Sequence, residues 1–156
     1  MKTENEIDFL RTYKDFIYFF NMLERNLGSS LRFCARTTGH KTPEKWHTAN
    51  FEKKIKKFMS LAKSNDLGAE FEDWHTKVQK CRHLRNIIAH GEWLWREWLE
   101  KPILYHAPDF PNGEGSFTTQ EFMEKLNFLK EVLESFQELR TPLEQAERNA
   151  SDKLNS

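Results

Sequence analysis

The residue types best suited to chemistry in this chain lie together in the stretch Arg85-Asn86-Ile87-Ile88-Ala89-His90. An imidazole titrates near neutral pH, so His90 can accept or donate a proton during a reaction. The Arg85 guanidinium keeps its charge and can bind a phosphate group through two parallel hydrogen bonds. Asn86 carries a donor and an acceptor, with which it can orient His90 or the phosphate. These groups are suited to phosphodiester cleavage without a metal ion.

RNA is the substrate class for which such a small set of groups is sufficient. The 2′-OH of RNA attacks the adjacent phosphate, so the protein supplies proton transfer and stabilises the charge on the phosphate oxygens. His90 is the candidate for proton transfer, and Arg85 is the candidate for phosphate binding. The expected products are a 2′,3′-cyclic phosphate and a 5′-OH. We expect no metal ion and no other cofactor.

One long helix is expected to carry these groups, from about residue 70 to residue 90. Gly91 follows it, and glycine is a common residue just after a helix end. With about 100° per residue, Asn86 and His90 share a polar side of this helix with Arg82 and His83, the candidate substrate-binding residues. The predicted core stripe consists of Phe71, Trp74, Val78, Cys81, Leu84 and Ile88.

Arg85 is unusual because it falls on the apolar side of this helix, between Trp74 and Val78 on the helical wheel. A guanidinium cannot lose its charge, and burying it without a partner is costly. Three placements avoid that cost. The side chain extends to solvent, pairs with a carboxylate, or faces a second surface on which an anion binds.

The N-terminal half of the chain contains two further segments with apolar residues at helical spacing. We expect a first helix over residues 6–27, an interruption at residues 28–30, and a short helical piece over residues 31–36. A second long helix is expected to begin at Thr48 or Asn50, which are both good N-caps, and to end near residue 65.

The C-terminal part is expected to begin with a short helix over residues 92–100. A small hairpin that pairs residues 103–105 with residues 116–118 is expected next. The last long helix should start at Thr118 or Thr119 and end near residue 140. Thr141 and Pro142 then suit the N-cap and the first position of a weak terminal helix.

The motif at residues 85–90 resembles the R-x4-6-H signature of the HEPN superfamily, the higher eukaryote and prokaryote nucleotide-binding domains. The polar Asn86 directly after the Arg agrees with that family. So do the position at the end of a long third helix and the small insertion before a final amphipathic helix. The resemblance covers most of the chain as architecture and residues 85–90 as motif.

The resemblance implies a HEPN-like, all-α antiparallel bundle of four to five helices over residues 1–140, with a C-terminal helix or solvated tail over residues 141–156. It implies a homodimer formed along the motif helix and, in active members, metal-independent endoribonuclease activity with Arg85, Asn86 and His90 as catalytic residues. Many members are toxins or antiviral defence proteins, so the expected partners include a cognate antitoxin or a second defence subunit. Members without catalysis imply the alternative, a module that binds RNA, a nucleotide or a protein.

A homodimer is also expected from the chemistry. One chain offers a single clear acid-base histidine, whereas transesterification is easiest when one group removes a proton and another supplies one. A two-fold axis beside the motif helix would bring two copies of His90 together, because each subunit presents the same patch.

Composition restricts the functional classes. The 24 Lys and Arg residues balance the 24 Asp and Glu residues, which argues against a protein that coats nucleic acid by bulk attraction. Two cysteines, Cys34 and Cys81, are too few for a disulfide framework and fit a reducing compartment. The polar first residues and the lack of a long apolar run predict a cytoplasmic protein without membrane contact.

Structural interpretations compete with these functional ones. His90 can be a helix-end histidine that is favoured by the helix dipole, and the motif can be a chance match in a plain helical interaction protein. A zinc site built from Cys81, His83 and His90 lacks the spacing of a structural zinc site. Trp93, Trp95 and Trp98 can stack bases or anchor a dimer, although packing is the default for tryptophan. Lysines 53, 54, 56 and 57 can follow an RNA backbone, but a solvated helix face is the expected role.

Overall fold

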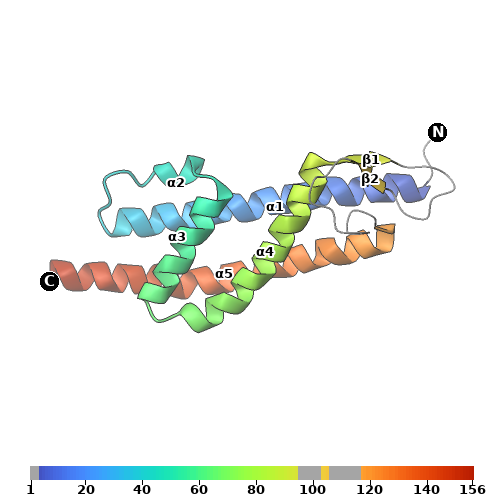
Figure 1. Cartoon of the computed structure of the whole chain (residues 1–156). Helices are drawn as coiled ribbons and strands as arrows, with labels where there is room; N and C mark the ends of the chain where they lie inside the picture. The colour runs from blue at the N-terminus through green and yellow to red at the C-terminus, as the bar shows by residue number, and fades with distance from the viewer. Residues whose placement is uncertain (1–3, 95–102, 106–116) are drawn as a thin grey trace. The chain divides into compact units, whose positions relative to one another are not determined.

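A computed structural model describes residues 4–94, 103–105 and 117–156 of the chain. The described residues form five helices and one two-stranded sheet (Figure 1). In chain order these elements are α1 (Glu4–Thr37), α2 (Lys45–Thr48), α3 (Phe51–Ser64), α4 (Gly68–His90), β1 (Glu92–Leu94), β2 (Ile103–Tyr105) and α5 (Thr119–Asn155). Apart from one small hairpin the described chain is helical, which confirms the all-α prediction. None of the described helices combines the length and apolarity that a membrane span requires.

The chain divides into two compact units, to both of which α1, α4 and α5 contribute. The first unit comprises Met1–Phe20 and Val78–Glu131, and so contains the start of α1, the end of α4, the hairpin and the start of α5. The second unit comprises Asn21–Lys77 and Val132–Ser156, and contains the rest of these helices together with α2 and α3. The motif residues belong to the first unit.

Aromatic side chains form the core of the first unit. The ring of Phe9 on α1 lies 5.0 Å from the ring of Phe122 on α5 and 5.1 Å from the ring of Trp93 on β1. Phe117, just before α5, stacks on Phe122 with the ring centroids 5.9 Å apart. Trp93 therefore anchors the hairpin to the unit, which confirms the packing interpretation for this tryptophan. Trp95 and Trp98 lie outside the described residues.

The core of the second unit is centred on Phe58 of α3. Its ring lies 5.3 Å from Phe71 and 5.5 Å from Trp74 of α4, and 5.3 Å from Phe136 of α5. The indole Nε1 of Trp74 donates a hydrogen bond of 3.1 Å to the Val132 carbonyl, so the polar atom of this buried ring is satisfied. One aromatic side chain thus joins three helices.

Within each unit, α1 and α5 run in the same direction. In the first unit Phe9 meets Phe122, and Lys130 lies over the ring of Phe19. In the second unit Arg148 lies over the ring of Phe33, and Ser151 donates a hydrogen bond of 2.8 Å to the Thr37 carbonyl. In both units the positions on α1 and α5 increase together, so the predicted antiparallel bundle is wrong for this pair. The parallel direction is possible because the chain between α1 and α5, which contains α2, α3 and α4, is long enough to return to the side where α1 begins.

The interruption predicted at residues 28–30 is also wrong, because α1 continues through Gly28. Glycine is unfavourable within a helix but allows another chain segment to approach closely. A Cβ atom at Gly28 would lie 2.9 Å from the backbone carbonyl oxygen of Trp46 and 3.3 Å from the Lys54 side chain. The glycine serves packing here and does not end the helix.

Helix α5 likewise continues through Thr141 and Pro142 to Asn155, so these residues do not begin a separate helix, and α5 crosses the predicted boundary at residue 140. Proline removes the hydrogen bond to the carbonyl of Glu138, one turn earlier. Both Pro142 and Glu138 are exposed, so water can solvate that carbonyl.

Two helix starts agree with the sequence. Asn50 caps α3 by accepting a hydrogen bond of 2.9 Å from the Lys53 amide. Thr118 caps α5, because its hydroxyl accepts from the Glu121 amide at 3.0 Å while the Glu121 carboxylate accepts from the Thr118 amide at 3.4 Å. This reciprocal pair is a capping box.

The predicted hairpin has the wrong partner strand. Residues 103–105 pair antiparallel with residues 92–94, with Trp93 opposite Leu104, whereas residues 117 and 118 form no strand and residue 116 lies outside the described residues. The predicted helix over residues 92–100 is therefore wrong for its first three residues, and its remainder lies outside the described residues. Alternating Trp and Leu residues after Gly91 suit a strand as well as a helix, and pairing with the apolar residues 103–105 decides between them.

Candidate functional site

The motif residues occupy the last turns of α4 in the first unit. Ile87 and Ile88 are 6% and 0% exposed although they project about 100° apart on the helix. The end of α4 is therefore covered by other parts of the unit on the sides of Ile87 and Ile88. Arg85, Asn86 and His90 remain partly or fully exposed. Leu84 was predicted in the core stripe but is half-buried, whereas the other five predicted core residues of α4 are buried.

Arg85 lies beside the core of the first unit, as its position on the wheel predicts. The side chain is half-buried, and its guanidinium carbon lies 5.6 Å from the ring centroid of Phe20 on α1. Its Nη1 donates a hydrogen bond of 3.3 Å to Oδ1 of Asn86. In the described part of the chain no carboxylate forms an ion pair with Arg85. Both observed partners are uncharged, so the guanidinium charge is not neutralised by them.

Asn86 and His90 lie one helical turn apart, and the sequence places them on the same side of α4. Asn86 is half-buried, and its carbonyl oxygen accepts from Arg85. His90 is exposed, and among the described residues its imidazole makes no hydrogen bond to Asn86 or Arg85. The structure thus joins Arg85 to Asn86 and leaves His90 one turn away and open to solvent.

The two predicted substrate-binding residues lie one turn before the motif. Arg82 is half-buried, and its Nη1 donates to Oε1 of Gln79 at 3.4 Å. His83 is exposed. Gln79, Arg82 and His83 are therefore partly or fully exposed to solvent on this part of α4. Contact with RNA stays a prediction for Arg82 and His83.

The electrostatics of a helix end bear on this site. The carbonyl groups at the C-terminal end of α4 carry partial negative charge, which repels a phosphate. A phosphate bound here would depend on the guanidinium groups of Arg82 and Arg85. Arg85 meets this need for a positive charge, because its observed partners, Asn86 and Phe20, are both neutral.

Neither cysteine is a candidate nucleophile. Burial is the largest cause that raises the pKa of the Cys81 thiol from its ordinary value of 9.0 to about 12. Burial, followed by the charges of Glu147 and Glu144, raises the pKa of Cys34 to about 12. Because the thiolate is the reactive form, both thiols are inert at neutral pH. Among the described residues, no three His, Cys, Asp or Glu side chains gather into a group that could hold a metal ion.

The sequence did not indicate two features of potential functional interest. Phe20 provides the ring under Arg85, but in the sequence it is one of several apolar residues in the first helix. Lys54 was expected on a solvated face, yet it is 4% exposed while lysines 53, 56 and 57 are exposed. The inward stripe of α3 runs through positions 51, 54, 55, 58, 59 and 62, and this spacing could have identified Lys54.

No family model, curated protein sequence or solved structure matches the chain. The resemblance to the HEPN superfamily therefore stays a prediction, which rests on the motif at residues 85–90 and its place at the end of α4.

Proposed function

We propose that this protein is a metal-independent endoribonuclease of the HEPN type, with its active site at the C-terminal end of α4. Arg85 binds the scissile phosphate, Asn86 positions the Arg85 guanidinium, and His90 transfers protons. The observation that carries the proposal is the Arg85–Asn86 hydrogen bond one turn before an exposed His90, since a guanidinium with only neutral observed partners and an accessible imidazole lie at the same helix end.

The proposed reaction is an internal transesterification. A base removes the proton of the 2′-OH, the 2′-oxygen forms a bond to phosphorus, and the bond from phosphorus to the 5′-oxygen breaks. An acid supplies a proton to that leaving oxygen, which gives the 2′,3′-cyclic phosphate and the 5′-OH. Arg85 stabilises the negative charge on the non-bridging oxygens as the new bond forms. Two proton transfers favour two imidazoles, and a homodimer supplies the second His90.

Exposed apolar side chains of the first unit support a dimer contact. Ile7, Leu10 and Tyr18 on α1 and Met123 on α5 are all at least 40% exposed. Large apolar side chains on a protein surface mark interaction sites when they gather, and Ile7, Leu10 and Tyr18 fall within about 80° of one another on the helical wheel of α1. The proposed interface therefore uses α1 in addition to α4.

The test is cleavage of RNA by the purified protein in excess EDTA. We expect cleavage of RNA but not of an all-deoxy oligonucleotide of the same sequence, because DNA lacks the 2′-OH. His90→Ala and Arg85→Ala should each abolish cleavage, and Asn86→Ala should reduce it. His47→Ala is the matched control, because His47 is exposed on α2 and has no part in the proposed site. Activity that requires added Mg²⁺ or Mn²⁺ would exclude this mechanism.

The hydrogen bond that Asn86 accepts from Arg85 favours a second candidate function, binding without catalysis. The carbonyl oxygen of Asn86 accepts from Arg85 and leaves His90 without an orienting hydrogen bond from either residue in one chain. A non-catalytic module that binds RNA, a nucleotide or a protein needs the arginine but not an oriented imidazole. Binding of RNA without cleavage, lost in Arg85→Ala and retained in His90→Ala, would establish this second function.

The biological role proposed with the first function is that of a toxin or an antiviral defence effector. Its partners would be RNA and a cognate antitoxin or a second defence subunit. A reducing, cytoplasmic location is consistent with two buried free cysteines, Cys34 and Cys81.

A further inference from the structure

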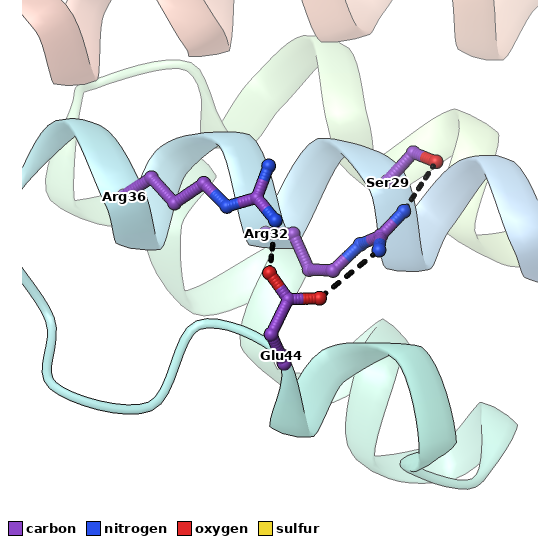
Figure 2. A network of polar contacts seen from close by, with 4 residues as sticks. All are labelled: Ser29, Arg32, Arg36 and Glu44. Atoms are coloured by element: carbon purple, nitrogen blue, oxygen red, sulfur yellow. Dashed lines mark hydrogen bonds and ion pairs between the residues drawn. The ribbon is translucent and has the colours of Figure 1, made fainter.

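A second group of charged side chains lies in the second unit, where α1 meets the start of α2 (Figure 2). Arg32 and Arg36 are one turn apart on α1, and both extend toward Glu44, the residue before α2. Nη1 of Arg32 lies 3.2 Å from Oε2 of Glu44, and Nη2 of Arg36 pairs with Oε1. The side chain of Glu44 is 59% exposed. Two guanidinium groups therefore share one carboxylate that solvent can reach.

Lys54 of α3 adds a third positive charge on α1, one helical turn before Arg32. Its Nζ donates to the Glu24 carbonyl at 3.4 Å, and its side chain reaches the surface of α1 at Gly28. Burial is the largest cause that lowers the pKa of Lys54, and the positive charge of Arg32 lowers it further, opposed by Glu24. Gly28 and Arg32 lie one helical turn apart on α1, so the position of the amine at Gly28 agrees with repulsion between Lys54 and Arg32.

The donors of this group exceed the acceptors that they meet. Nη2 of Arg32 reaches Oγ of Ser29 only at 3.5 Å. In the described part of the chain, Nε of Arg32 is buried and has no hydrogen-bond partner. Arg32 and Arg36 share one exposed carboxylate, Glu44, while Lys54 is attracted by the charge of Glu24, so three cations are met by two carboxylates. A ligand with more charge and more acceptor oxygens than a carboxylate would satisfy this group better.

We propose that Arg32, Arg36 and Lys54 form a binding site for a phosphate dianion, which the Glu44 carboxylate occupies in the absence of ligand. The site lies outside the α4 motif and does not rest on the proposed ribonuclease activity. Inorganic phosphate and the terminal phosphate of a phosphomonoester share the required chemistry.

Charge decides which phosphates can displace Glu44. A phosphomonoester carries a charge of about −1.5 to −2 at neutral pH and presents three terminal oxygens. A phosphodiester carries a single negative charge, as the Glu44 carboxylate does, and gains nothing in charge by replacing it. The site therefore selects monoesters and inorganic phosphate over the internal phosphates of a nucleic acid.

Glu44 is well placed to act as the displaceable anion. It follows the connection between α1 and α2, and α2 has only four residues. Its carboxylate makes its ion pairs with Arg32 and Arg36 at an exposed position, where such pairs are weak and exchange with solvent. The ring contacts of Phe58 are with Phe71, Trp74 and Phe136 and involve none of these charged residues, so we expect exchange at Glu44 to leave this core intact.

The test measures binding of three probes to the full chain by isothermal titration at pH 7.5 and equal ionic strength. The probes are inorganic phosphate, a nucleoside 5′-monophosphate and dimethyl phosphate, which is a diester. We expect inorganic phosphate and the nucleoside 5′-monophosphate to bind, and the tighter of the two shows whether the site prefers free phosphate or a phosphomonoester. Dimethyl phosphate should bind at least tenfold more weakly. Glu44→Gln should tighten binding of inorganic phosphate about fivefold or more, because it removes the competing charge.

Matched variants separate the site from general charge effects. Arg36→Gln and Lys54→Met should weaken phosphate binding about tenfold, whereas Lys57→Met and Glu134→Gln, at exposed positions in the same unit, should leave it unchanged. If Lys54→Met does not fold, the exposed Arg36→Gln decides alone. The proposal is overturned if neither the natural protein nor Glu44→Gln binds phosphate, if Glu44→Gln binds no tighter, or if dimethyl phosphate binds equally well.

Discussion

The guanidinium of Arg85 lies over the ring of Phe20, with 5.6 Å between the guanidinium carbon and the ring centroid. Phe20 is 1% exposed, so its ring presents a fixed face to the charged group. A cation over an aromatic face is stabilised by the ring quadrupole, most strongly when both groups are partly desolvated. This contact explains how Arg85 occupies the apolar side of α4 without a carboxylate among its described partners.

The first prediction concerns that contact. A double-mutant cycle with Phe20→Leu and Arg85→Met should give a coupling free energy of about 0.5–1 kcal/mol, measured by urea unfolding. The matched cycle with Phe19→Leu and Lys130→Met should give less, because Lys130 is exposed and lies over a half-buried ring. Coupling within error of zero for the Arg85 pair would mean that the ring does not hold the guanidinium.

The second prediction separates function from stability on α4. His90→Ala should leave the free energy of unfolding nearly unchanged, because the His90 side chain is exposed. Ile88→Ala should cost about 2–5 kcal/mol, because Ile88 is 0% exposed and its truncation leaves a cavity. Leu84→Ala should cost less, since Leu84 is only half-buried. A loss in His90→Ala as large as that in Ile88→Ala would show that the histidine is structural.

The sequence was informative where a pattern is local. The end of α4 at His90, the N-cap Asn50 and the start of α5 near Thr118 depend on residues within one or two turns, and local spacing identifies them. The unusual position of Arg85 was also readable from the wheel. Its partner Phe20 was not, because that contact depends on how α1 packs beside α4.

Several wrong predictions involve contacts between segments that are distant in the sequence. Gly28 resembles a helix break until Trp46, far along the chain, packs against it. Residues 103–105 have two candidate partner strands, and only the packing of Trp93 on Phe9 favours the observed one. The parallel direction of α1 and α5 depends on the path of three intervening helices, which no local pattern encodes. Lys54 is an intermediate case. Its position on the buried stripe of α3 could be predicted from local spacing, but lysine side chains are usually exposed to solvent.

The third prediction concerns the pH dependence of stability and the buried Cys81. Its folded pKa of about 12 lies above the ordinary value of 9.0, so the folded thiol keeps its proton where the unfolded thiol loses it. The unfolded state then binds fewer protons, and stability falls as pH rises above 9. The contribution is fully present below pH 9 and is lost at about 1 kcal/mol per pH unit through the interval between the two values.

Cys81→Ala should flatten this decrease, as measured by urea unfolding at several values between pH 8 and pH 10.5. Lys54 acts in the opposite direction, because its lowered pKa makes the folded state release a proton before the unfolded state does. It is present in both proteins, so the difference between their slopes isolates the thiol. Equal slopes, or rapid alkylation of the native thiol at pH 8, would mean that Cys81 is accessible and ordinary.

The last prediction tests the close approach at Gly28. Alanine within a helix is favoured over glycine by about 1 kcal/mol, so Gly28→Ala would stabilise α1 if the space were open. The added Cβ would instead lie 2.9 Å from the Trp46 carbonyl oxygen, and crowding of this kind costs about 1–3 kcal/mol. We expect a net destabilisation of about 1 kcal/mol in urea unfolding. Gly68→Ala is the control, because its Cβ would meet atoms only at 3.6 Å and beyond, and it should be neutral or slightly stabilising. Gly28→Ala as stable as Gly68→Ala would mean that α2 moves freely away from α1.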